Sequence, residues 1–155
     1  MANTEILVSD LLFDTWEEHP DTPALGLAGE WAYSYRQLAS VTERLAERLV
    51  EQGVQAGDRV AILSENQPNW GVAYLAINRC GAVVVPVLPD FPASDVKSIL
   101  SHAEVAACFA SAKLRSKAVE AGLDDGAASV YLLDNLERLD SLSKSAVERS
   151  IAVKS

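Results

Sequence analysis

RVAILSENQPNWGVAYLAINRCGAVVV, residues 59–85, decides the fold, because it carries two apolar strand patterns separated by one helix pattern. Residues 60–63 and 82–85 are continuously apolar and rich in Val, Ala and Ile, and the first of these runs follows Arg59. Residues 68–79 between them have a proline at the start and are followed by a glycine, which are typical helix boundary residues. Continuous apolar strands indicate burial on both faces of a sheet. We therefore predict two parallel strands joined by a helix.

The same alternation continues toward the C-terminus. Val96, Ile99, Leu100 and Ala103 share one face of a predicted helix that follows a proline-rich turn. Further elements are predicted as a strand at 105–109, a helix at 112–121 and a strand at 130–133. A last amphipathic pattern begins at Asp134 and Glu137 and runs through Leu136, Leu139 and Leu142. The predicted fold class is α/β, with a parallel sheet flanked by helices.

The N-terminal part predicts a short helix, a β-hairpin and a long helix. Residues 9–18 form the short helix with Ser9 as its N-cap, and residues 23–35 form an N-terminal β-hairpin that turns at Gly29. Ser34 and Gln37 match a capping box at the start of the long helix. Its apolar face contains Leu38, Val41, Leu45 and Leu49, and its opposite face contains Glu43, Arg44, Glu47, Arg48 and Glu51. That charged face is interpreted as solvated, with a docking surface as the alternative.

Length and composition indicate one globular unit. The chain has 155 residues, of which 49% are hydrophobic and 23% are charged, so it can bury one sizeable core. We expect residues 1–155 to be a single domain or subdomain, with 143–155 as a loosely ordered tail. A formal net charge of −9 argues against nucleic acid as a partner.

The positions of the cysteines and histidines, together with the N-terminal sequence, narrow the class of protein further. Cys80 and Cys108 each lie in an apolar run, where a free thiol packs as a small hydrophobic group. His19 and His102 are far apart in the sequence, so no metal site is predicted. The N-terminus lacks a signal-peptide pattern, and no apolar run is long enough to cross a membrane. The simplest interpretation is a cytoplasmic protein.

The residues themselves predict no catalytic centre. The predicted strand at 59–63 ends in Ser64-Glu65-Asn66-Gln67-Pro68, which has no glycine to admit a phosphate and carries a carboxylate that would repel it. No serine stands in a nucleophile elbow. His102 lies late in a predicted helix without an acidic partner, and packing or capping explains it better than base catalysis.

Residues 31–111 resemble the N-terminal part of the AMP-forming acyl-CoA synthetases, which belong to the adenylate-forming superfamily. The matching features, in order, are Tyr33-Ser34-Tyr35 before Leu38, Gly53-Val54, Gly57-Asp58-Arg59-Val60-Ala61, Asn66, and Gly81-Ala82-Val83 running to Pro86 and Pro89. With residues 9–30 included, the resemblance covers about three quarters of the chain. It implies that the chain is part of the large N-terminal domain of the acyl-CoA synthetase-like fold.

Ser64-Glu65-Asn66-Gln67-Pro68-Asn69-Trp70 is most similar to the long-chain fatty-acid–CoA ligases. The resemblance makes this corner a connection typical of the family, with Asn66 capping the next helix and Trp70 packing against it. The whole family joins a carboxylic acid to coenzyme A (CoA), using ATP and Mg²⁺ and releasing AMP and pyrophosphate.

The family's phosphate loop, its adenine and ribose motifs, its hinge and its C-terminal lysine have no counterpart here. The resemblance therefore implies the opening segment of a longer ligase, cut naturally or by choice of the expressed region, and inactive alone. Fatty acid, ATP and CoA would then bind through downstream residues, and the uncovered surface could form a homo-oligomer. In some relatives the segment after the third strand approaches CoA. This implies a CoA contact by Lys113, Arg115 and Lys117, with ordinary surface cations as the alternative.

Two other hypotheses remain open. One is a fragment of another adenylating enzyme that activates an amino acid or an aryl acid. The other is a free-standing, non-catalytic α/β domain that acts through protein contacts.

Overall fold

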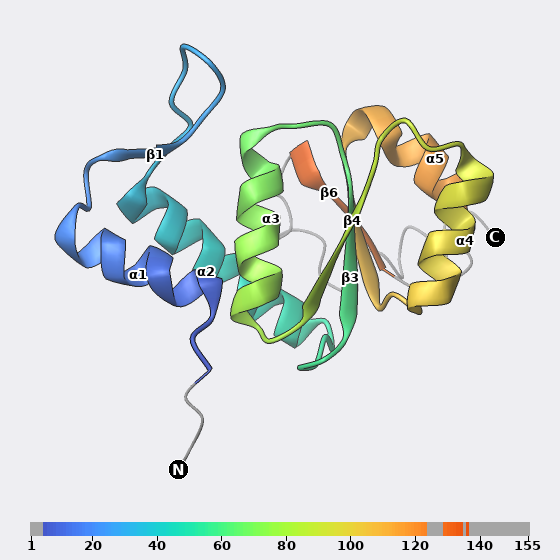
Figure 1. Cartoon of the computed structure of the whole chain (residues 1–155), viewed down its shortest axis with the longest axis horizontal. Helices are drawn as coiled ribbons and strands as arrows, with labels where there is room; N and C mark the ends of the chain where they lie inside the picture. The colour runs from blue at the N-terminus through green and yellow to red at the C-terminus, as the bar shows by residue number, and fades with distance from the viewer. Residues whose placement is uncertain (1–4, 124–128, 135, 137–155) are drawn as a thin grey trace, which may run out of the picture.

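A four-stranded parallel sheet forms the centre of the described part of the chain (Figure 1). The computed structural model describes residues 5–123, 129–134 and 136. The strands are ordered β4-β3-β5-β6, and each neighbouring pair is parallel. Their bounds are β3 Arg59–Leu63, β4 Val83–Val87, β5 Ala107–Ala110 and β6 Ser129–Leu132. The predicted fold class is confirmed.

Helices cover both faces of this sheet. Figure 1 shows α1, α2 and α3 on one side and α4 and α5 on the other. Their bounds are α1 Val8–Glu18, α2 Tyr35–Glu51, α3 Pro68–Arg79, α4 Ala93–Ala103 and α5 Arg115–Glu120. In β3, Val60 and Ile62 join the core under α2 and α3, whereas Ala61 and Leu63 join the core under α4 and α5. Burial of both faces explains why this strand is apolar at every position from Val60 onward.

Strand β4 runs two residues further than the sequence predicted and includes Pro86. The N–H of Val83 donates to the carbonyl of Asp58 at 2.7 Å, so alternate residues of β4 direct their N–H groups toward β3. By this alternation, Val84 and Pro86 face the outer edge of the sheet. Proline lacks an N–H, so it is tolerated at an edge position where no ladder bond is lost.

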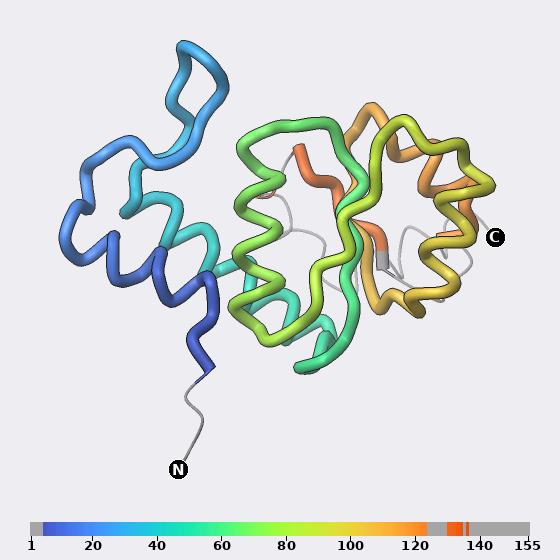
Figure 2. The backbone as a smooth tube through the Cα atoms, viewed as in Figure 1, coloured from blue at the N-terminus to red at the C-terminus, as the bar shows by residue number. Residues whose placement is uncertain are grey.

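The N-terminal hairpin projects from the body of the molecule (Figure 2). Its strands β1 (Pro23–Leu25) and β2 (Tyr33–Ser34) are antiparallel, as predicted. The N–H of Glu30 donates to the carbonyl of Leu27 at 3.0 Å, and Gly29 has a φ of +82°. A positive φ costs glycine little, which explains this residue in the turn. The capping box at the start of α2 is also confirmed, with Ser34 and Gln37 bonded reciprocally.

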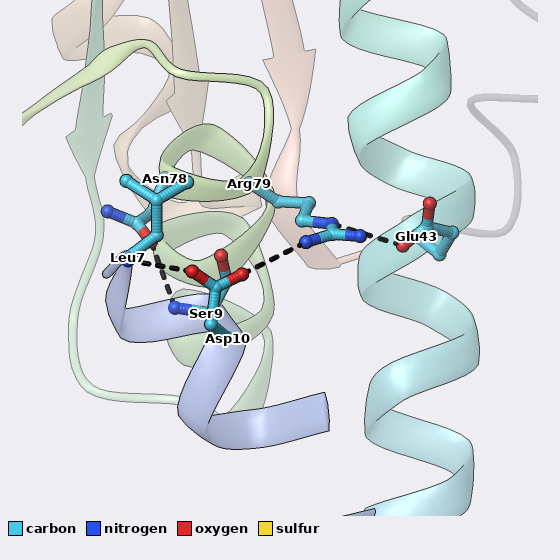
Figure 3. A network of polar contacts seen from close by, with 6 residues as sticks. All are labelled: Leu7, Ser9, Asp10, Glu43, Asn78 and Arg79. Carbon is cyan, nitrogen blue, oxygen red and sulfur yellow. Dashed lines mark hydrogen bonds and ion pairs between the residues drawn. The ribbon is translucent and has the colours of Figure 1, made fainter. Parts of the chain in front are cut away.

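Helix α1 begins earlier than predicted. Its N-cap is Leu7, whose N–H donates to the carboxylate of Asp10 at 2.8 Å. Ser9 is therefore inside the helix, and its N–H donates to Oδ1 of Asn78 in α3 at 3.0 Å (Figure 3). The prediction of Ser9 as N-cap was wrong because a distant amide, which local sequence does not reveal, satisfies this N–H.

Arg79, at the end of α3, joins the three helices on this side of the sheet (Figure 3). Its Nη1 donates to Oδ1 of Asp10 in α1 at 3.2 Å, and its Nε lies 3.3 Å from Oε2 of Glu43 in α2. The guanidinium carbon also lies 4.6 Å from the ring centroid of Phe13. Glu43 was predicted on a solvated face; instead it faces α3 and is half-buried.

Three further boundaries differ from the sequence prediction. Strand β5 begins at Ala107 instead of residue 105, and β6 lies one residue earlier than predicted. The predicted helix at 112–121 is divided into a 3₁₀ turn, η1 (Ala112–Leu114), and the short helix α5. Glu137, Leu139, Leu142 and the predicted tail at 143–155 lie outside the described residues.

Candidate functional site

The polar corner after β3 lies at the carboxyl edge of the sheet, where the connections leaving β3, β5 and β6 meet. Strand β4 follows β3 in the chain and pairs on one side of it, whereas β5 pairs on its other side. The topology therefore changes direction between β3 and β5. Ligands of open α/β sheets bind outside the carboxyl ends of the strands at such a switch point. This edge is therefore where the fold favours a ligand site.

Glu65 and Ser111 bridge this switch point. The hydroxyl of Ser111, which is fully buried, donates to Oε2 of Glu65 at 2.7 Å. Ser64 is 3% exposed, and its hydroxyl donates to the carbonyl of Glu65 at 2.7 Å. The amide of Gln67 donates to Oγ of Ser64 at 3.1 Å. These groups hold the connections together, and the Ser111 hydroxyl, which is bonded to Glu65, is buried away from solvent.

A second set of hydrogen bonds links the corner to the hairpin and β6. Gln67 Nε2 donates to Oδ1 of Asp134 at 3.1 Å, and the N–H of Ala112 reaches the same oxygen at 3.2 Å. Asn69 Nδ2 donates to the carbonyl of Leu133 at 2.9 Å, and its Oδ1 accepts from the Tyr33 hydroxyl at 2.6 Å. The side chains of Asn69 and Asp134 are therefore held in place from several elements.

A cavity of about 620 Å³ lies beside this second set of hydrogen bonds. Its walls include Tyr33 of β2, Asn69 of α3, Asp134, and the exposed side chains Arg36, Ser40 and Arg44 of α2. The sequence placed Arg44 on a solvated face and named Tyr33, Asn69 and Asp134 for other reasons, without predicting that these residues share a cavity. Helical periodicity identifies a shared face, but not the loop or strand opposite it, so the sequence offered no signal for this cavity.

The predictions made for Asn66 and Trp70 had different outcomes. Asn66 was expected to cap α3, but the N-cap is Gln67, in an extended conformation, and Pro68 is the first helical residue. The predicted cap was therefore one residue too early. Trp70 packs against the core, as expected, and its ring stacks on Tyr74 with centroids 5.7 Å apart.

The expected CoA cluster lies on η1 and α5. Lys113 and Arg115 are exposed, whereas Lys117 is half-buried and its Nζ donates to the carbonyl of Pro89 at 2.6 Å. Pro89 belongs to the connection that follows β4. The carboxyl-edge connection of β4 and the basic segment after β5 are therefore joined, although 28 positions separate the two residues.

The described residues do not provide a magnesium site. They contain no group of three or more His, Cys, Asp or Glu side chains placed to hold a metal ion. The connection after β3 has no glycine, and its carboxylate faces Ser111. These residues do not fit Mg²⁺ or a nucleotide phosphate, so we assign no catalytic step to them.

The two cysteines behave as packed thiols. Burial raises the pKa of Cys108 to about 12. Burial is also the largest cause that raises the pKa of Cys80, which is half-buried. A thiol with a raised pKa is less often the reactive thiolate at neutral pH, so neither cysteine has the character of a nucleophile.

In the described ranges, no helix has the length and apolar character needed to span a membrane.

The fold defines the class: an α/β unit with a parallel sheet, whose carboxyl-edge connections are joined by side-chain hydrogen bonds. Residues 12–153 match the AMP-binding enzyme family. The chain therefore belongs to this family of ATP-dependent, adenylate-forming enzymes. Its fold matches the N-terminal domain of the acyl-CoA synthetase-like fold.

The similar proteins include CoA ligases and nonribosomal peptide synthetases. The chain is 36% identical over 108 residues, or 70% of its length, to a methyl-dioxo-octahydroindenyl-propanoyl:CoA ligase of Mycobacterium tuberculosis. It is 31% identical over 105 residues, or 64% of its length, to nonribosomal peptide synthetase 2 of Gibberella zeae. A solved structure from Rhodopseudomonas palustris, described as a candidate long-chain-fatty-acid CoA ligase, matches 83% of the chain with a TM-score of 0.77 and 25% identity.

The chain is much shorter than these proteins. It spans 21% of the M. tuberculosis ligase, 2% of the peptide synthetase and 33% of the R. palustris structure. The family match thus identifies the kind of enzyme, while the remaining length of such enzymes lies outside these residues.

Proposed function

We propose that these residues are the N-terminal segment of an ATP-dependent fatty-acid–CoA ligase. The complete enzyme would join a carboxylate to AMP with release of pyrophosphate, and would then transfer the acyl group to the thiol of CoA. The observation that carries the proposal is the family match over residues 12–153 together with the similarity to a CoA ligase. The similarity to the R. palustris structure favours a long-chain fatty acid.

Residues 1–155 would act as a scaffold in this enzyme. The described side chains at the carboxyl edge bond to one another, and none of them is poised as a nucleophile or metal ligand. ATP, Mg²⁺ and fatty acid would bind through residues outside this chain. We therefore expect the isolated segment, treated as one domain, to be inactive.

Fatty-acid-dependent exchange of pyrophosphate into ATP tests this proposal. The complete protein that contains these residues should catalyse exchange when palmitate is supplied, because acyl-AMP formation is reversible. The chain of 155 residues, used as the matched control, should give only background. Absence of exchange from the complete protein with every fatty acid tested would contradict the fatty-acid assignment.

Amino-acid activation is the second candidate, favoured by the similarity to nonribosomal peptide synthetase 2. The same exchange assay separates the two candidates when amino acids and aryl acids are supplied in parallel. Exchange with an amino acid and not with palmitate would replace the first proposal. Exchange with neither class would favour a non-catalytic interaction domain.

A CoA contact at Lys113, Arg115 and Lys117 is part of the same proposal. The exposed cations Lys113 and Arg115 could meet CoA phosphates, while Lys117 fixes the neighbouring connection through Pro89. We expect Arg115→Glu in the complete enzyme to raise the KM for CoA about tenfold, because a charge-assisted phosphate contact is replaced by repulsion.

Arg59→Glu is a charge-matched control for this prediction, since Arg59 is exposed at the opposite end of β3. It should leave the KM for CoA unchanged, and neither variant should alter the KM for ATP. An unchanged KM for CoA in Arg115→Glu would remove this contact from the proposal.

Location and self-association belong to the proposal as well. Two free thiols, Cys80 and Cys108, suit a reducing cytoplasm. Exposed apolar side chains, which include Ile6, Trp31 and Leu88, offer surface for contact with other parts of the enzyme or with a second copy.

A further inference from the structure

The cavity beside α2 combines positive charge with a fixed polar wall. Its volume of about 620 Å³ lies within the roughly 300–1,000 Å³ range of small-molecule sites. Arg36 and Arg44 are eight positions apart on α2, so both reach the same side of the helix, about 12 Å apart along its axis. This concentration of guanidinium groups contrasts with the chain's net charge of −9.

The polar side chains of Asn69 and Asp134 in the cavity wall are already engaged. Both polar atoms of the Asn69 side chain have partners, in Tyr33 and Leu133. Oδ1 of Asp134 accepts from Gln67 and from the N–H of Ala112, which offsets part of its charge. An incoming molecule would therefore meet a rigid wall on this side, with few acceptors to satisfy.

The α2 side supplies unused donors. Among the described residues, the side chains of Arg44 and Ser40 make no hydrogen bond or ion pair, and Arg36 uses its Nε on Asp21 at 3.3 Å. A guanidinium has five N–H donors in a planar fork that matches carboxylate and phosphate oxygens. Tyr33, Val41 and Leu136 add aromatic and apolar surface to the same cavity.

From this combination we infer that the cavity beside α2 binds a small organic anion, with its phosphate or carboxylate on Arg44 and Arg36 and its apolar part against Tyr33. The inference does not depend on the reaction of the complete enzyme, because every group that it uses lies within this chain.

Phenyl phosphate is the probe, titrated into the ¹⁵N-labelled chain and followed by NMR. We expect saturable shifts of backbone amides in the first half of α2 and at Tyr33 and Asn69. Arg44→Gln should weaken binding about tenfold, because one charge-assisted hydrogen bond is lost. Arg36→Gln should weaken it in the same direction.

Arg48→Gln is the matched control, since it removes the same charge from α2 at a residue outside the cavity wall. It should leave the Kd unchanged, and phenol, which has the same ring without the phosphate, should not saturate these shifts. The spectrum of each variant shows whether it is folded. The inference is overturned if phenyl phosphate gives no saturable shifts at the cavity, if phenol matches it, or if Arg44→Gln and Arg48→Gln bind equally.

Discussion

Replacing Phe109 with alanine should lower the free energy of unfolding by about 3–5 kcal/mol. Phe109 is fully buried in β5, a central strand, and its ring centroid lies 5.3 Å from that of Tyr131 in β6. The substitution removes apolar contacts and leaves a cavity between the sheet and its covering helices. Urea denaturation followed by circular dichroism should show a lower midpoint with a similar slope.

Phe109→Leu is the control for this prediction. Leucine retains much of the volume, so we expect its cost to be below about 1.5 kcal/mol. A loss of less than about 1 kcal/mol for Phe109→Ala would contradict our assignment of this residue to the centre of the core. Equal losses for the two variants would show that volume is not the cause.

Replacing Arg79 with methionine should cost about 2 kcal/mol of unfolding free energy, the second largest effect that we expect. Methionine retains an apolar side chain but loses the ion pairs with Asp10 and Glu43 (Figure 3) and the cation–π interaction with Phe13. Two carboxylates, one from α1 and one from α2, would then lack their shared cation. Urea denaturation at low and high salt measures the effect, which should shrink at 1 M NaCl.

Arg36→Met provides the comparison, because Arg36 forms a single ion pair with Asp21 and both side chains are largely exposed. Exposed pairs of this kind contribute at most about 1 kcal/mol, so this variant should differ from the parent chain by less than about 1 kcal/mol. If Arg79→Met is equally mild, Arg79 does not join the three helices energetically.

Elements with a strong local pattern were predictable. Ser34 and Gln37 lie three residues apart, and their capping box forms where the sequence placed it. Residues 59–63 are apolar at nearly every position because helices cover both faces of β3, and this burial leaves a readable pattern. Boundaries were less predictable: Pro86 lies within β4, because its position at the sheet edge makes the missing N–H harmless.

The candidate sites depended on contacts that sequence spacing does not encode. Glu65 meets Ser111 across 46 positions, and Asn69 meets Leu133 across 64. Glu43 and Arg44 are adjacent on a charged helix, yet the first faces Arg79 and the second lines the cavity. Local sequence could not separate them, because each role is set by the element that packs opposite.

The sequence by itself determined the α/β class, the alternation of strands and helices along the chain, and the resemblance to adenylate-forming enzymes. Periodicity, capping and turn residues act over a few positions, so they can be read directly. The tertiary structure alone decided that the corner after β3 is bridged by Ser111, that Arg79 joins three helices, and that two arginines of α2 share a cavity with Asn69 and Asp134. Those features arise from packing between distant segments, which brings groups together irrespective of their spacing in the chain.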